Sequence, residues 1–186
     1  MNYQETLNWM FNQLPMYQQQ GASAYKEDLT NSILFSDYLG NPEKDLKFIH
    51  VAGTNGKGST CAFLRAAIEG AGLTAHAYTS PHLVRFNERI RVAGSLIEDA
   101  QLASVLAEVL YAAEAADIGP SFFEATTAAA FLAFSRTPAD AAIIEVGLGG
   151  RLDATNIIPA PIVTGIAQLG LDHEAFLLDP ENGPGY

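Results

Sequence analysis

Residues 51–60 read VAGTNGKGST, a glycine-rich stretch that overlaps the end of the apolar run KFIHVA at 47–52. The strict Walker A pattern is not met, because it requires glycine five positions before the Gly-Lys pair and Ser or Thr directly after the lysine. Val51 and Gly58 occupy those two positions. The case for nucleotide binding therefore depends on the physical context of this stretch.

That context favours a phosphate-binding loop. The glycines at 53, 56 and 58 allow a tight turn in which several N–H groups point at one spot, and a helix start adds partial positive charge. Lys57 supplies a full charge, and Ser59 or Thr60 offers a hydroxyl for a metal ion or phosphate. A purely structural turn would need the glycines, but it would not need a lysine between two of them.

Composition describes a globular chain of 186 residues, with 48% hydrophobic and 17% charged residues. This length fits a single domain. The formal net charge is −11, and Lys and Arg number only ten together. Because a nucleic-acid backbone is bound by clustered Lys and Arg, we expect no nucleic-acid partner.

The location of the protein is predicted from three features. Cys61 is the only cysteine, which excludes an internal disulfide and is typical of a reducing compartment. The start, MNYQETLNWM, lacks the basic and apolar regions of a signal peptide. The longest uncharged apolar-rich run, ATTAAAFLAFS at 125–135, is too short to span a bilayer. We expect a cytoplasmic protein with no membrane contact.

Hydrophobic periodicity predicts helices that alternate with strands. Two N-terminal helices are expected, one with Leu7, Met10, Phe11 and Leu14 on its apolar face and one with Leu29, Ile33, Leu34 and Tyr38, joined by a loop at 18–28. Further helices are expected at 59–71, 98–110 and 124–136, strands at 47–52, 73–80, 139–147 and 161–169, and a hairpin about Ala93-Gly94. The last two strands look buried on both faces. The alternation predicts an α/β fold, a mainly parallel sheet flanked by helices with ligands beyond the carboxyl ends of the strands.

Polar residues follow several of these strands. Ser80, in TSPH at 79–82, either ligates Mg²⁺ or begins an ordinary turn, and by itself the stretch favours the turn. Glu145 interrupts an apolar strand end, where its carboxylate needs a cation or strong donors, and magnesium and Arg151 are two solutions. His173, in LGLDHEAF at 169–176, is more typical of a structural residue, because imidazole suits transition metals better than magnesium.

Five stretches in order resemble the folylpolyglutamate synthase and dihydrofolate synthase family, within the ATP-dependent Mur ligase superfamily. They are HVAGTNGKGST at 50–60, TSPHLVRFNERIRV at 79–92, FFEATT at 122–127, EVGLGGRLDATNI at 145–157 and GLDH at 170–173. The match extends to about Leu177. In this family the phosphate loop is GTNGKGS, so the unmet Walker pattern is a family difference. The resemblance implies a P-loop ATPase domain of the Mur ligase type.

The resemblance also implies roles for individual residues. The ATP phosphates would be held by Thr54, Asn55, Gly56, Lys57, Gly58 and Ser59. Magnesium would be bound at sites that include Ser80, Glu145 and His173. The pterin or folate would contact Phe122, Phe123, Glu124, Ala125, Leu152, Asp153 and Ala154. No side chain has to act as a covalent nucleophile, and Lys57 would stabilise the transferring phosphoryl group.

The implied activity joins L-glutamate to dihydropteroate or folylpolyglutamate through an acyl phosphate, with ATP and Mg²⁺, in a monomeric parent enzyme. Family members continue past GLDH into a smaller C-terminal domain and carry a carbamylated lysine, whereas Lys57 is the last lysine here. We therefore expect residues 1–177 to be an incomplete N-terminal ATP-binding domain, 178–186 an irregular tail, and the C-terminal glutamate-ligase domain to be absent. Such a truncated form would have little activity alone, and the alternative is a catalytically inactive nucleotide-binding remnant or interaction module.

Overall fold

The computed structural model describes residues 2–14, 28–179 and 183–184. A six-stranded sheet with the order β4-β3-β2-β5-β1-β6 forms its middle layer. The strands are β1 Phe48–Ala52, β2 Ala75–Tyr78, β3 Ile90–Val92, β4 Ser95–Leu96, β5 Ala141–Glu145 and β6 Val163–Ile166. Strands β2, β5, β1 and β6 are parallel, and β3 and β4 continue the sheet in antiparallel pairing. The predicted α/β fold with a mainly parallel sheet is confirmed.

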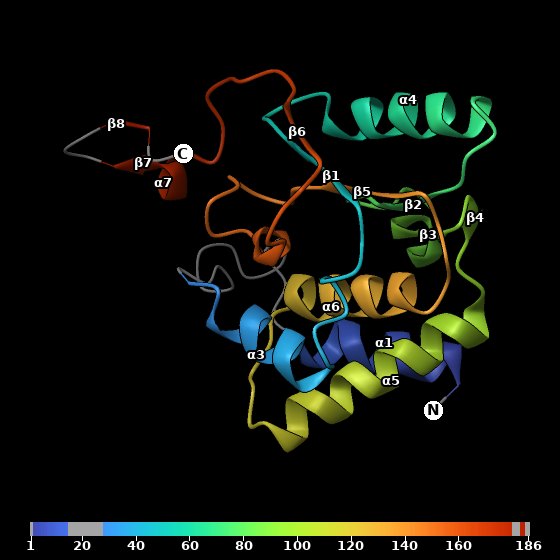
Figure 1. The fold of residues 1–186 in the computed structure, drawn as a ribbon. Helices are drawn as coiled ribbons and strands as arrows, with labels where there is room; N and C mark the ends of the chain where they lie inside the picture. The colour runs from blue at the N-terminus through green and yellow to red at the C-terminus, as the bar shows by residue number, and fades with distance from the viewer. Residues whose placement is uncertain (1, 15–27, 180–182, 185–186) are drawn as a thin grey trace.

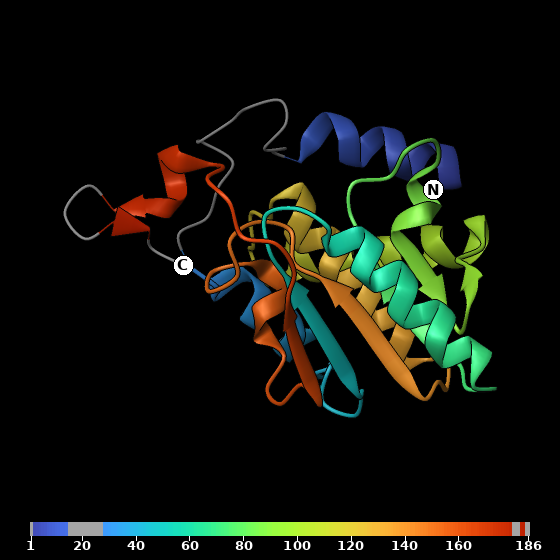
Figure 2. The same cartoon turned by 90° about the horizontal axis from the view of Figure 1, so that it is seen from above.

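Helices cover both faces of the sheet (Figure 1). The longer helices are α1 Tyr3–Gln13, α3 Thr30–Tyr38, α4 Lys57–Gly70, α5 Asp99–Ala115 and α6 Phe122–Ser135. Helix α4 lies on one face, whereas α6 lies on the other face with α1, α3 and α5 packed beyond it (Figure 1). Figure 2 shows the arrows of β1 and β5 running in the same direction, as parallel pairing requires.

Each face of the sheet has its own core, because successive strand residues point to opposite faces. On the α4 side, Ile49 and Val51 of β1 pack with Cys61 and with small residues of β2 and β5. On the α6 side the packing is bulkier and includes Phe48 and Phe131, whose ring centroids are 5.3 Å apart. The residues that follow β1 lie at the carboxyl edge of the sheet, and α4 begins directly after them and returns along one face.

Strand β6 differs from its predicted environment. It lies at the edge of the sheet, and Val163 and Ile166 are 53% and 68% exposed. The prediction that both late strands are buried on both faces is therefore wrong for β6 and right for β5, in which all five residues are buried. An apolar run indicates a strand, but its place in the sheet depends on segments distant in the sequence.

The prediction of which residues form the buried face of α3 is also wrong. Ile33, Leu34 and Tyr38 are exposed, and Phe35 and Ser36 face the interior instead. The hydroxyl of Ser36 donates to the carboxylate of Glu43 at 2.8 Å, so a polar pair occupies the buried side of this helix. For α1 the prediction holds, since Leu7, Met10 and Leu14 are buried.

One tight turn and the last described residues complete the fold. Ala93 and Gly94 have φ values of +47° and +89° and connect β3 to β4, which confirms the predicted hairpin. A short helix α7, Glu174–Leu177, precedes β7 Leu178–Asp179, which pairs with β8 Gly183–Pro184 where the sequence predicts an irregular tail. The predicted loop at 18–28 lies outside the described residues except for Asp28. In the part of the chain that the structure describes, no helix has the length and apolar character to cross a membrane.

Candidate functional site

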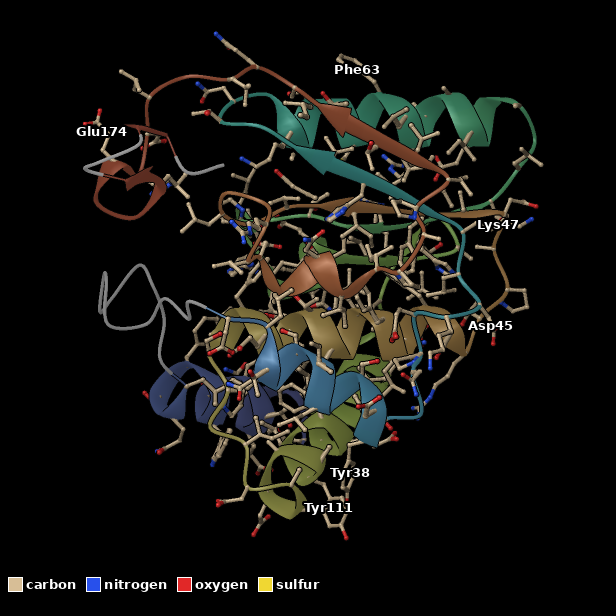
Figure 3. The ribbon with its side chains drawn as sticks, turned by 60° about the vertical axis from the view of Figure 1, so that its left-hand side comes forward. Tyr38, Asp45, Lys47, Phe63, Tyr111 and Glu174 are labelled. Atoms are coloured by element: carbon tan, nitrogen blue, oxygen red, sulfur yellow. The ribbon has the colours of Figure 1, made fainter. Side chains whose placement is uncertain are left out.

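The candidate site lies where β1, β2 and β5 reach their carboxyl ends. The loop 53–56 follows β1, Ser80 follows β2, and Glu145 is the last residue of β5. In Figure 3, Asp45 and Lys47 mark the opposite, amino end of β1, and Glu174 lies on the side of the site. This is the edge at which parallel α/β sheets bind ligands.

The glycine-rich loop depends on two backbone conformations that favour glycine. Gly53 has φ +134°, and a Cβ there would lie 3.1 Å from Cβ of Ala167. Gly56 has φ +81° and precedes α4 as its N-cap, with no side-chain hydrogen bond to the cap. The N–H groups of the first helical turn therefore have no side-chain cap, and Asn55, Gly56, Gly58 and Ser59 are exposed.

The start of the loop is held by the segment that follows β6. The N–H of Thr54 donates to the carbonyl of Gln168 at 2.7 Å. The hydroxyl of Thr54 donates to the carbonyl of Gly170 and accepts from its N–H, both at 3.0 Å. Thr54 therefore fixes the loop through its backbone and its side chain.

The ammonium group of Lys57 lies over the same loop. Its Nζ donates to the carbonyl oxygens of Gly53 at 2.7 Å and Thr54 at 3.1 Å. Lys57 is half-buried, so its charge is held close to the exposed loop residues. This arrangement can neutralise a bound anion such as a phosphate.

Glu145 lies beside this loop and is only 4% exposed. Its Oε2 accepts a hydrogen bond from the N–H of Ser80 at 3.0 Å, and a Cβ on Gly58 would lie 3.6 Å from both carboxylate oxygens. Burial raises the pKa of Glu145, while the Ser80 N–H and the charges of Lys57 and Arg89 oppose that shift. A buried carboxylate next to a serine fits a magnesium ion, which prefers oxygen ligands.

His173 does not join these residues in a metal-binding group. Its N–H donates to Asp172 Oδ1 at 2.7 Å, and its Nε2 lies 3.8 Å from Asp172 Oδ2. Among the described residues, no three His, Cys, Asp or Glu side chains are placed to hold a metal ion together. The structure therefore brings Ser80 and Glu145 together, whereas the role of His173 stays a prediction.

The predicted pterin-contacting residues 122–125 begin helix α6. Glu124 is buried and forms a capping box, accepting from the N–H of Ser121 at 2.6 Å while its own N–H donates to the Ser121 hydroxyl at 3.2 Å. Phe122 and Ala125 are buried, and Phe123 is half-buried. The carboxylate of Glu124 therefore has a structural function at the helix start in this conformation.

The second predicted substrate segment, 152–154, is organised by Asp153. Its buried carboxylate accepts from the N–H groups of Gly147 at 3.0 Å and Leu148 at 2.9 Å, and from both the N–H and the hydroxyl of Thr155. Burial raises the pKa of Asp153, and these donors oppose the shift. Asp153 thus closes the loop after β5, between half-buried Leu152 and buried Ala154.

Arg89 is a residue of the site to which sequence reasoning gave no role. It is 4% exposed, and its charge acts on Glu145, whereas Arg151, the predicted alternative partner of Glu145, is exposed. The segment 79–92 contains three arginines, at 85, 89 and 91, and no local pattern distinguishes the buried one. Only the packing of the folded chain identifies Arg89.

Comparisons with known proteins identify relatives of this chain by sequence and by fold. No protein-family profile matches the chain. Dihydrofolate synthase/folylpolyglutamate synthase of Bacillus subtilis is 39% identical over 176 residues, which are 92% of this chain and 39% of that protein. Escherichia coli FolC in complex with DHPP and ADP has a TM-score of 0.84 at 35% identity, over 95% of this chain and 40% of that one. A bifunctional folylpolyglutamate synthase/dihydrofolate synthase with Mn, AMPPNP and L-glutamate bound has a TM-score of 0.80 at 34% identity. That match covers 93% of this chain and 39% of the other chain.

Sequence and fold therefore lead to the same relatives. The chain spans about two fifths of the length of these proteins. The glycine-rich loop, the serine after β2 and the glutamate at the end of β5 all lie in the matched part. The chain belongs to the folylpolyglutamate synthase and dihydrofolate synthase family.

Proposed function

We propose that this chain supplies the phosphate-binding part of an ATP-dependent ligase of folate metabolism. The ligase joins L-glutamate to dihydropteroate or to a (tetrahydro)folylpolyglutamate. The observation that carries the proposal is the position of Lys57, whose ammonium lies over an exposed glycine loop with the buried carboxylate of Glu145 beside it. Two related structures, one in complex with DHPP and ADP and one with Mn, AMPPNP and L-glutamate bound, support the same substrates here.

The residues divide into three groups with different tasks. The nucleotide phosphates are bound by the N–H groups of the loop 54–59 and by Lys57. Ser80 and Glu145 hold Mg²⁺, with His173 as a further predicted ligand, and the bound ion supplies positive charge beside the phosphates. The surfaces of 122–125 and 152–154 receive the pterin. We also propose that the enzyme is monomeric and cytoplasmic.

The reaction then proceeds by two transfers. A carboxylate oxygen of the pterin substrate attacks the γ-phosphorus of ATP, and the bond to ADP breaks. The amine nitrogen of glutamate next attacks the acyl carbon, phosphate leaves, and the nitrogen loses a proton to give the amide. Lys57 and the loop N–H groups stabilise the charge of the transferring phosphoryl group, and catalysis is mainly positioning.

A second candidate function is nucleotide binding without catalysis. It is favoured by the exposed glycine loop and the position of Lys57, which are sufficient to bind a phosphate without further catalytic groups. ADP release separates the two candidates. We would incubate the protein with ATP, Mg²⁺ and dihydropteroate or a reduced folate, with and without L-glutamate, and the ligase proposal predicts ADP formation that requires glutamate. ATP binding without glutamate-dependent ADP release would instead support the second candidate.

A further inference from the structure

Arg89 is a buried cation that forms no ion pair among the described residues, although its charge acts on the buried Glu145. The side chain is 4% exposed. Its Nε donates to Nδ1 of His82 at 2.8 Å, whereas its Nη atoms make no hydrogen bond to the described residues and are not fully buried. A buried charge is costly unless it is paired, and a guanidinium cannot release its proton at physiological pH.

The acidic and basic groups around Arg89 are already committed to other partners. Glu88, its neighbour in the 3-10 helix η2, Phe86–Arg89, accepts instead from the N–H groups of Leu83, Val84 and Arg85. Burial and the charge of Arg89 lower the pKa of His82, so this histidine is a neutral acceptor. Glu145 is held by the N–H of Ser80 at 3.0 Å. None of these groups supplies the two coplanar oxygens that a guanidinium binds most strongly.

The guanidinium is also held in one orientation by aromatic rings. Its central carbon lies 5.5 Å from the ring centroid of Phe122 and 5.8 Å from that of Phe86. Cation–π contacts and the hydrogen bond to His82 restrict the side chain, so little conformational entropy remains to be lost on binding an anion. The guanidinium therefore contacts Phe122, a predicted pterin contact, and its charge acts on Glu145, a predicted magnesium ligand.

We infer that Arg89 binds the carboxylate of the pterin substrate and positions it for attack on the γ-phosphate, a role that rests on the proposed function. An anion that pairs with Arg89 must lie close to the ring of Phe122 and to Glu145, because Arg89 contacts the first and acts electrostatically on the second. On the proposed function, the reacting carboxylate is the group that must lie there, joined to a ring system at Phe122 and directed toward the nucleotide. A planar carboxylate matches the fork of the guanidinium.

The test compares two probes that differ only in charge, pteroic acid and its carboxamide. The wild-type protein should bind the acid roughly tenfold or more tightly than the amide, the usual effect of a charge-assisted contact. Arg89→Met should lose that preference because its affinity for the acid falls while its affinity for the amide stays the same. Arg89→Lys should retain part of the preference. Affinity for a non-hydrolysable ATP analogue should stay unchanged in both variants, which also verifies that they fold.

A matched control is available four positions earlier. Arg85 is exposed and pairs with Asp99 at 2.9 Å, so Arg85→Met should keep the full preference for the acid. A preference that survives in Arg89→Met would overturn the inference, as would equal binding of acid and amide by the wild type. If Arg89→Met loses affinity for the ATP analogue, the anion that Arg89 binds belongs to the nucleotide, and this result would also overturn the inference. If the wild type binds neither probe, the proposed function itself fails.

Discussion

The backbone N–H of Ser80 donates to Oε2 of Glu145 at 3.0 Å, which joins the ends of β2 and β5 across the sheet. The same carboxylate lies next to Gly58 in the first turn of α4. Burial raises the pKa of Glu145, and the charges of Lys57 and Arg89 offset that shift only in part, so further positive charge would stabilise its ionised form. A divalent cation next to the glycine-rich loop would supply that charge.

Glu145→Gln tests this role. Glutamine keeps an oxygen acceptor for the Ser80 N–H but removes the charge, so nucleotide affinity without Mg²⁺ should be unchanged. The increase in affinity that Mg²⁺ produces in the wild type should fall roughly tenfold, as expected for one lost charged contact. Nucleotide titrations with and without Mg²⁺ measure both quantities.

Glu43→Gln is the matched control, because Glu43 is also buried but bonds to Ser36 outside the site. This variant should respond to Mg²⁺ as the wild type does. An undiminished Mg²⁺ response in Glu145→Gln would show that the carboxylate has no part in metal binding.

Gly147→Ala should disturb the surface predicted to receive the pterin. A Cβ at this position would lie 2.5 Å from Cζ of Phe123, so the ring must move. We expect a loss of about 1–3 kcal/mol in the free energy of unfolding, the usual cost of overpacking. Gly150→Ala is the control, since no heavy atom lies within 4 Å of its added Cβ. Urea unfolding of both variants measures the difference, and equal stabilities would contradict the proposed contact.

His76 should make stability depend on pH. It is fully buried, its Nδ1 accepts from the N–H of Ala93 at 3.0 Å, and its Nε2 lies 2.9 Å from the carbonyl oxygen of Thr137. This pairing needs a neutral ring, and burial lowers the pKa of His76 below its ordinary 6.5. The unfolded chain therefore binds a proton that the folded chain rejects, and the free energy of unfolding falls as pH drops below 6.5.

His76→Gln should reduce this slope by up to about 1.4 kcal/mol per pH unit, the value for one proton. Burial lowers the pKa of His50 in the same direction, so a residual slope should remain. Urea unfolding between pH 5 and 7 measures the slopes, a range chosen around the ordinary histidine value. Identical slopes in the wild type and the variant would exclude His76 as the source.

Much of the fold could be predicted because its signals are local. Alternating helical and strand patterns predict the parallel sheet, and the lysine between two glycines predicts the loop before α4. The acid at the end of β5 was recognisable because an ionised group rarely interrupts an apolar strand without a partner. These features depend on residues close together in the sequence.

The errors and omissions have a different cause. The exposure of Val163 depends on how many strands lie beside β6, and the polar interior of α3 depends on Glu43 reaching Ser36. Arg89 became recognisable only when Phe122 and His82 were placed around it. Environments built by distant segments are not encoded in local periodicity, and tertiary packing decides them.

The most direct test of the account is the ATP affinity of Lys57→Ala, measured by direct titration beside Lys47→Ala. Lys57 donates from Nζ to Gly53 and Thr54 within the loop, whereas Lys47 is exposed at the amino end of β1. We expect Lys57→Ala to lower ATP affinity about tenfold or more, because a charged contact to phosphate is lost. Lys47→Ala should bind ATP as the wild type does. Unchanged ATP affinity in Lys57→Ala would contradict the central claim that VAGTNGKGST holds the nucleotide phosphates.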